Sequence, residues 1–118
     1  MNKKDIGNKN EKLAQKFLEK KGYKILDTNF STKFGEIDII AKKGNFIVFV
    51  EVRSKSYSYF GKPFETVDKN KIKKILKTAQ IYISNKNLQN LDVRFDVISI
   101  ENEKINHIQS AFDLDYLS

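Results

Sequence analysis

The alternation of apolar and polar residues along the chain predicts two amphipathic helices and five strands. Residues 8–21 carry apolar side chains at helical spacing, and Gly22 is suited to end that helix. A second helix is predicted from Asp68, a suitable N-cap residue, to about residue 85. The predicted strands comprise residues 23–30, 35–40, 46–53, 92–100 and 105–109.

This order of elements, helix, three strands, helix and two strands (αβββαββ), predicts an α/β protein. With one helix before the central hairpin and one after it, we expect a mixed β-sheet flanked by helices on both faces. Such cover explains why residues 46–50 form a continuous apolar run. At 118 residues the chain is predicted to be a single domain, residues 1–118.

The central hairpin carries an acid in each of its two apolar strands. Gly44-Asn45 lies between the strands and suits the positive backbone angles of a two-residue hairpin turn. With that turn, Asp38 faces Glu51 across the hairpin, and Glu36 faces Arg53. Directly opposed side chains have Cβ atoms about 4.5–5.5 Å apart, so two like charges there are destabilising.

Two opposed carboxylates on apolar strands indicate a bound cation. Magnesium prefers oxygen ligands and is usually held by one or two carboxylates together with water and phosphate oxygens. We expect Asp38 and Glu51 as ligands and the carbonyl of Val52 as a third. The alternative is an ion-pair ladder, in which Arg53 and a nearby lysine neutralise the two acids.

A third acid, Glu11, lies at the edge of the apolar stripe of the first helix, one turn before Ala14. It is placed to lean over the sheet toward the hairpin acids. The alternative is a solvated glutamate on the helix surface.

The net charge of the chain indicates a class of binding partner. A formal net charge of +7, almost all from lysine, favours polyanions such as nucleic acid, although an AT-rich genome would also enrich lysine, asparagine and isoleucine. Cysteine is absent, which excludes disulfides and thiolate chemistry. The lone histidine, His107, is expected to be structural or on the surface. No apolar run suits a membrane span or a signal peptide, so we expect a cytoplasmic protein with no membrane partner.

Two segments are candidates for contact with nucleic acid. The second helix carries a stripe of Lys69, Lys73 and Lys77, with Lys71 beside it; the alternative is a solvated helix face. The loop after the third strand interleaves Lys55 with Tyr57 and Tyr59, a composition typical of surfaces that stack on unpaired bases. The alternative is that its aromatic side chains fold onto the core.

The acidic motifs resemble those of a known family. The matching segments are Gly7-x3-Glu11-x2-Ala14, Gly35-Glu36-Ile37-Asp38, Val50-Glu51-Val52-Arg53, Phe60-Gly61, Val67-x3-Lys71, Ala79, Arg94-Phe95-Asp96-Val97 and Ala111-Phe112. Together they resemble the YraN-like family of small bacterial proteins of uncharacterised function. That family is similar in turn to the PD-(D/E)XK nuclease superfamily, especially archaeal Holliday junction resolvases.

The resemblance implies a restriction endonuclease-like core and an active site of Asp38, Glu51 and the helix acid Glu11. It implies an endonuclease that uses Mg²⁺ or Mn²⁺ to hydrolyse DNA phosphodiester bonds, with branched or flapped DNA among the candidate substrates. The chain departs from the superfamily pattern at Arg53, where that pattern has lysine. Arginine stays protonated, so it can hold a phosphate but cannot act as a base; Lys55 or Lys71 would have to assist proton transfer.

Two other functions remain open. One is a nucleic-acid-binding module that keeps the fold but has lost turnover, and the other is a structural protein whose acids form an ion-pair ladder. The sequence also leaves open a homodimer.

Overall fold

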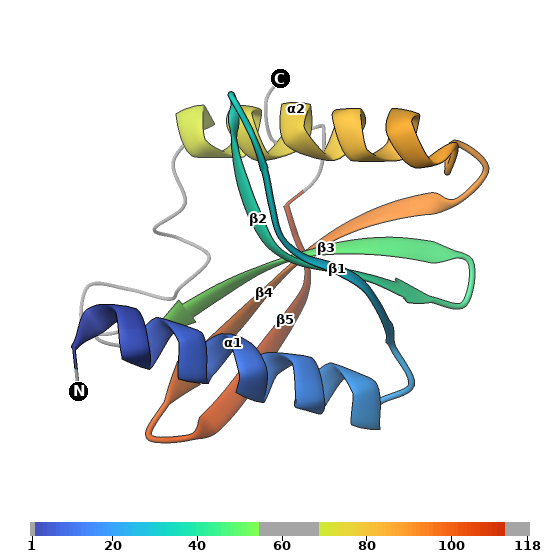
Figure 1. Cartoon of the computed structure of the whole chain (residues 1–118). Helices are drawn as coiled ribbons and strands as arrows, with labels where there is room; N and C mark the ends of the chain where they lie inside the picture. The colour runs from blue at the N-terminus through green and yellow to red at the C-terminus, as the bar shows by residue number, and fades with distance from the viewer. Residues whose placement is uncertain (1, 55–68, 113–118) are drawn as a thin grey trace.

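The computed structural model describes residues 2–54 and 69–112 (Figure 1). The elements are α1 (Lys3–Lys20), β1 (Lys24–Thr32), β2 (Gly35–Lys43), β3 (Phe46–Ser54), α2 (Lys69–Lys86), β4 (Asp92–Glu101) and β5 (Lys104–Phe112). Neither of these two helices is both long and apolar enough to cross a membrane, in the part of the chain that the structure describes.

The five strands form one mixed sheet in the order β1-β2-β3-β4-β5. Strands β3 and β4 are parallel, and the other neighbouring pairs are antiparallel. Helices α1 and α2 lie on opposite faces of the sheet (Figure 1). The predicted order αβββαββ and the mixed sheet between two helices are therefore confirmed.

Strand β3 is buried on both of its faces, which accounts for its continuous apolar run. Ile47 and Phe49 pack in one core cluster with the inner face of α2. Val48 and Val50 point the other way and pack in a second cluster with Ala14 and Leu18 of α1. Alternate residues of a strand point to opposite faces, so a strand between two helices has no polar face.

The ends of several elements differ from the sequence prediction. Helix α1 begins at Lys3 rather than near residue 8, because the Asn2 side chain accepts the Asp5 N–H at 2.9 Å and caps a first turn that lacks apolar periodicity. Strand β1 continues to Thr32, with Asn29 inside it at a φ of 52° rather than in a turn. Strand β5 extends to Phe112. The predicted cap Asp68 lies outside the described residues.

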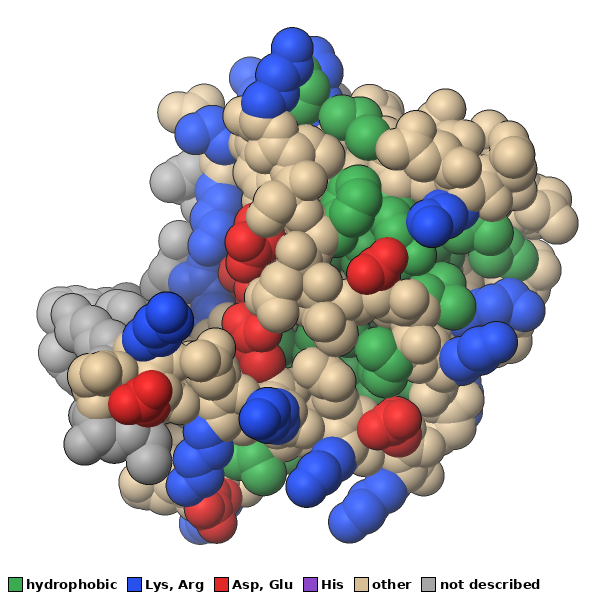
Figure 2. All heavy atoms as spheres, viewed as in Figure 1, with side chains coloured by type: hydrophobic (Ala, Val, Ile, Leu, Met, Phe, Trp, Pro, Cys, Tyr) green, Lys and Arg blue, Asp and Glu red, His purple; other side chains and the backbone are tan. Residues whose placement is uncertain are grey.

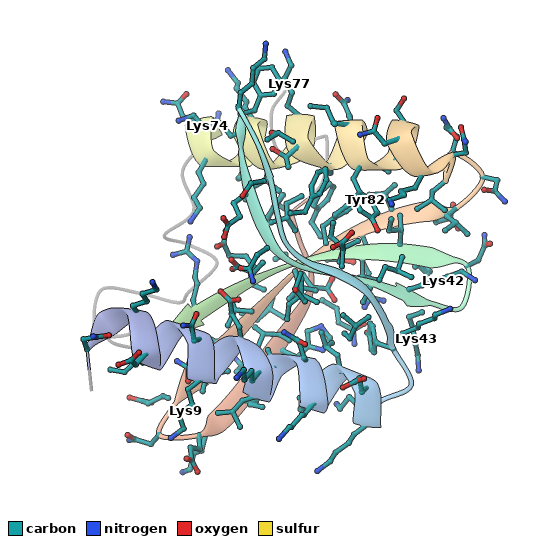
Figure 3. All side chains as sticks on the ribbon, in the orientation of Figure 1. Lys9, Lys42, Lys43, Lys74, Lys77 and Tyr82 are labelled. Atoms are coloured by element: carbon teal, nitrogen blue, oxygen red, sulfur yellow. The ribbon has the colours of Figure 1, made fainter. Side chains whose placement is uncertain are left out.

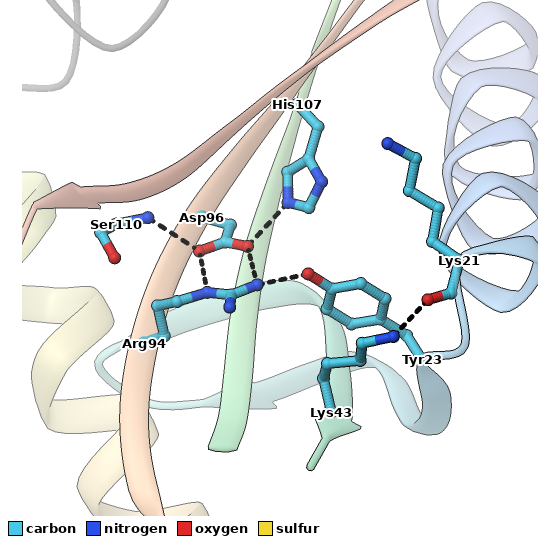
Figure 4. Close-up of polar contacts among 7 residues, drawn as sticks. All are labelled: Lys21, Tyr23, Lys43, Arg94, Asp96, His107 and Ser110. Atoms are coloured by element: carbon cyan, nitrogen blue, oxygen red, sulfur yellow. Dashed lines mark hydrogen bonds and ion pairs between the residues drawn. The ribbon is translucent and has the colours of Figure 1, made fainter. Parts of the chain in front are cut away.

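A buried polar network ties β4 to β5 and to the start of β1 (Figure 4). The Asp96 side chain is 0 % exposed, and its carboxylate accepts hydrogen bonds from Arg94 at 2.8 and 2.9 Å. It also accepts the Ser110 N–H at 3.0 Å, next to an irregularity in the β4–β5 ladder. His107, 5 % exposed, contacts the same carboxylate through Nε2 at 2.7 Å, while Arg94 also donates to the Tyr23 hydroxyl.

This network shows how the fold stabilises a buried carboxylate. Burial alone would raise the pKa of Asp96, but the hydrogen bonds from His107, Arg94 and the Ser110 amide lower it below its usual value. Because Asp96 stays ionised as an acceptor, His107 must carry a proton on Nε2. The prediction that His107 is a structural residue agrees with this contact.

Phe49 should dominate the cluster under α2. Its side chain is 2 % exposed and lies against the rings of Tyr82 and Phe95. We expect Phe49→Ala to lower the free energy of unfolding by about 3–5 kcal/mol, the usual cost of an emptied aromatic site. Phe46 on the same strand is 38 % exposed, so Phe46→Ala should cost no more than about 1 kcal/mol. Urea denaturation of both variants measures the difference, and equal losses would contradict this assignment of the core.

Candidate functional site

The sheet forks in the middle of the β2–β3 hairpin. The hairpin turn has the predicted two residues, although only Gly44 of the pair has a positive φ, 57°. The paired residues run from Lys43 opposite Phe46 to Ile39 opposite Val50, which is the predicted register. Beyond that point β2 remains paired with β1 as far as Gly35, while β3 remains paired with β4 as far as Ser54.

Asp38 and Glu51 are the first residues beyond the end of this ladder. The carboxylate of Asp38 accepts the Val52 N–H at 2.8 Å, so a side chain takes the place of a backbone acceptor where the pairing stops. The Glu51 carboxyl is close enough to interact with Asp38 by charge and by a side-chain hydrogen bond. The structure therefore brings the two predicted acids together. Glu36, predicted to face Arg53, lies farther along the fork and accepts a hydrogen bond from the Ser31 hydroxyl at 2.9 Å.

The electrostatics of Asp38 are unusual for an aspartate. Burial, together with the negative charges of Glu51 and Glu11, raises its pKa to about 7, although the hydrogen bond from the Val52 amide opposes the change. The carboxylate pair thus stores unfavourable energy when Asp38 is ionised.

Glu11 of α1 belongs to the same acidic group, as the sequence suggested. Burial raises its pKa, a side-chain hydrogen bond with Asn29 lowers it, and the charge of Glu36 raises it again. Its charge in turn acts on Asp38. Glu11 is therefore partly buried at the mouth of the fork, not on the outer surface of the helix.

Two basic residues lie beside the acids. Lys71, in the first turn of α2, places Nζ 3.3 Å from Oε2 of Glu51. Arg53 is partly buried two residues beyond Glu51, on the same face of β3. Figure 2 shows one side of the molecule, with a short band of acidic side chains left of centre and Lys or Arg side chains next to them.

A small pocket opens at the fork. Its lining includes Asp38, Glu51 and Glu36, with apolar support from Phe49, Ile75 and Phe112. Within the described ranges no three acid or histidine side chains form a complete metal cage. Magnesium does not require one, since it commonly takes one or two carboxylates and completes its shell with water and phosphate oxygens. The pair of Asp38 and Glu51 fits that donor set.

The predicted nucleic-acid contacts fall in two groups. Lys69, Lys73 and Lys77 are exposed on α2, the helix whose Lys71 reaches Glu51. Figure 3 shows Lys74 and Lys77 near the tip of the β1–β2 hairpin. The loop residues Lys55, Tyr57 and Tyr59 lie outside the described residues, and their role stays a prediction.

Sequence reasoning missed two members of the site. Asn29 forms a side-chain hydrogen bond with Glu11, and Glu36 lines the pocket and raises the pKa of Glu11. The sequence could have indicated Glu36 as a site residue, since it lies two residues before Asp38 in the same acidic motif. Nothing in the sequence indicated Asn29, because only the folded backbone reveals its left-handed conformation inside β1.

The fold and the site define a class: a mixed α/β protein with a half-buried acid pair where two strands of its sheet part. Residues 10–100 match the sequence model described as "Uncharacterised protein family UPF0102". The chain belongs to this family. That result confirms the family resemblance that the acidic motifs indicated.

Relatives match the chain over nearly its whole length. It is 50 % identical over 110 residues to a UPF0102 protein of Persephonella marina, covering 93 % of this chain and 95 % of the relative. It is 52 % identical over 108 residues to one of Thermodesulfovibrio yellowstonii, covering 92 % and 96 % of the two chains. A relative from Caldanaerobacter subterraneus subsp. tengcongensis is 48 % identical over 119 residues, covering 95 % and 98 %.

The raised pKa of Asp38 should make stability depend on pH. The folded state holds the Asp38 proton more tightly than the unfolded state, so the stabilisation is complete below pH 4 and is lost as the pH rises through 7. A change from 3.8 to about 7 corresponds to at most about 4 kcal/mol, at 1.36 kcal/mol per pH unit. In Asp38→Asn, whose amide oxygen can still accept the Val52 N–H, this decline should disappear.

Urea denaturation of both proteins from pH 4 to 8 measures that difference. We expect the variant to be equal to the wild type near pH 4 and more stable at pH 8. A variant that is less stable at pH 8 would show that Asp38 is held by a cation, as in an ion-pair ladder.

Proposed function

We propose that this protein is a metal-dependent endonuclease that hydrolyses DNA phosphodiester bonds on a restriction endonuclease-like core. The observation that carries the proposal is the half-buried pair of Asp38 and Glu51 at the fork of the sheet. Two further predictions accompany the proposal: the protein is located in the cytoplasm, and it acts on branched or flapped DNA.

Two aspartates in the described part of the chain, the buried Asp96 and the half-buried Asp38, differ in their surroundings. Asp96 is surrounded by Arg94, His107 and a backbone amide, and its pKa is lowered. Asp38 is next to Glu51 and Glu11, and its pKa is raised. The fold thus supplies the Arg94 guanidinium to the buried Asp96. At the fork Lys71 pairs with Glu51, yet Asp38 still has a raised pKa beside two further acids, which suits a site that receives an additional cation from solution.

Asp38 and Glu51 would hold the ion, with the Val52 carbonyl as a third oxygen. When bound there, Mg²⁺ would polarise a phosphoryl oxygen and lower the pKa of a water molecule. The chain supplies the other groups. Arg53 carries a planar guanidinium that can bind the scissile phosphate through two parallel hydrogen bonds. Lys71, whose ammonium group lies 3.3 Å from Oε2 of Glu51, would contact a phosphate bound beside the ion.

A second function is favoured by one residue. Arg53 occupies the position where the nuclease superfamily has lysine, and an arginine cannot give up its proton at neutral pH. A module that binds nucleic acid on this fold without turnover would keep the positive surface of α2 and tolerate the change. Cleavage assays separate the two functions.

Cleavage is the direct test. We expect purified protein with Mg²⁺ or Mn²⁺ to nick supercoiled plasmid or to cut a flapped duplex. Arg53→Ala should reduce the rate about 10²–10³-fold, the scale for loss of one preorganised donor, while Arg53→Lys should retain part of the activity. Asp38→Asn should be inactive. Asp92→Asn is the matched control, because Asp92 is exposed and pairs with Phe46 at the opposite end of β3 from the fork.

One outcome would rule out the proposed endonuclease activity. If the wild type binds DNA with a steep dependence on salt but cuts none of these substrates with either ion, the binding module is the function. If Asp92→Asn loses as much activity as Asp38→Asn, the loss does not report on the acid pair.

Metal binding should also stabilise the folded protein. For a dissociation constant of about 1 mM, 10 mM Mg²⁺ would add about 1.4 kcal/mol to the free energy of unfolding. The gain should be present at pH 8, nearly absent at pH 5 where Asp38 holds its proton, and abolished in Asp38→Asn. Denaturation with and without the ion measures it, with Asp92→Asn again as control. A gain that survives in Asp38→Asn would place the ion elsewhere.

A further inference from the structure

The turn between β1 and β2 presents an aromatic ring between two lysines. The Nζ of Lys77 lies 4.6 Å from the centroid of the Phe34 ring, and the Nζ of Lys33 lies 5.2 Å from it. Phe34 is only partly buried. In Figure 3, Lys77 stands at the tip of the hairpin above α2, with Lys74 nearby. Aromatic and basic side chains thus meet at one point on the surface.

The turn is fixed on α2 by a continuous chain of hydrogen bonds. The Phe34 N–H donates to Oγ1 of Thr32 at 3.1 Å, and the Thr78 hydroxyl donates to the Lys74 carbonyl at 2.8 Å. The hydroxyls of Thr32 and Thr78 are 3.2 Å apart, so Thr32 is left to donate to Thr78. Gly35 also approaches the helix closely, since a Cβ there would lie 3.5 Å from the Cβ of Lys74. The Phe34 ring is therefore carried by a rigid support.

The ring and the acid pair are connected through two elements that contact each other, α2 and β2. Along α2, Lys71 at the acid pair and Lys77 at the ring are about 9 Å apart at 1.5 Å per residue. Phe34 immediately precedes β2, and at 3.3 Å per residue an extended chain from Phe34 to Asp38 spans about 13 Å.

Building on the proposed function, we propose that Phe34, Lys33 and Lys77 form a platform that stacks an unpaired nucleobase of the DNA, a short way along the strand from the phosphate held at the acid pair. The two lysines cover the ring in the free protein and turn to the flanking phosphates when a base takes their place. An aromatic ring reaches a base face only where the strand is unpaired. The substrate class is therefore DNA with a single-stranded segment beside the cleavage point.

Binding without cleavage tests the platform. Fluorescence anisotropy, in buffer without divalent metal, compares a short single strand with a blunt duplex of equal length. We expect Phe34→Ala to weaken binding of the single strand about 5- to 150-fold, the range for loss of one stacked base, and to leave duplex binding unchanged. Phe34→Trp should bind the single strand as the wild type does. Thermal unfolding confirms that both variants are folded.

The matched control is Phe46→Ala. Phe46 is also an exposed aromatic residue beside a cation, with the Arg94 guanidinium 5.6 Å from its ring, but it lies at the end of β3 away from the fork. Its loss should not change binding. Lys33→Ala and Lys77→Ala should each flatten the salt dependence on the single strand by about 0.7 in the log–log slope.

The outcomes separate the platform from the proposed enzyme. If Phe34→Ala binds the single strand as tightly as the wild type, or loses duplex binding equally, the platform is wrong while metal-dependent cleavage can still hold. If Phe34→Ala loses single-strand binding selectively but the wild type cuts no DNA with metal, the platform holds and the enzyme fails. A wild type that binds no DNA overturns both.

Discussion

Strand β3 has to pair with β2 on one side and β4 on the other, while a helix covers each of its faces. Strand β3 pairs with β4 along its whole length but with β2 along only about half of it. The other half of β2 stays with β1, whose turn is fixed on α2 through Thr32 and Thr78. Strands β2 and β3 must therefore part, and the Val52 amide bonds to the Asp38 carboxylate in place of a backbone acceptor.

This geometry explains how an acid pair persists inside an apolar sheet. Asp38 satisfies a backbone donor that the parting strands leave, so its position is set by the fold and not by a countercharge. Its raised pKa then follows from burial and from Glu51. Both helices contribute to the same place, Glu11 from α1 and Lys71 from α2. The candidate site is thus assembled from both layers that cover the sheet.

The periodicity of the sequence was sufficient to predict the elements, because two-residue and 3.6-residue repeats reflect which side chains are buried. The Gly44-Asn45 turn was sufficient to predict the register that brings Asp38 to Glu51. Neither signal predicts where a ladder ends, since the fork depends on contacts between the β1–β2 turn and α2, far apart in sequence. These signals also do not predict the buried network of Asp96, whose partners His107 and Ser110 come from another strand. They do not predict the helix cap at Asn2 either, because it precedes the apolar repeat.

The position of the acids at the end of the ladder has a consequence for assembly. A β-hairpin closes from its turn outward, and β2 and β3 are adjacent in the chain, whereas β4 arrives only after α2. Before β4 is in place, nothing but the side chains stops β2 and β3 from pairing past Ile39 and Val50. The next pair in that register would set Asp38 directly against Glu51, where like charges oppose each other. Charge repulsion between the two carboxylates therefore acts together with the attachment of the β1–β2 turn to α2 in ending the hairpin ladder, which leaves the outer half of β3 available for its parallel partner.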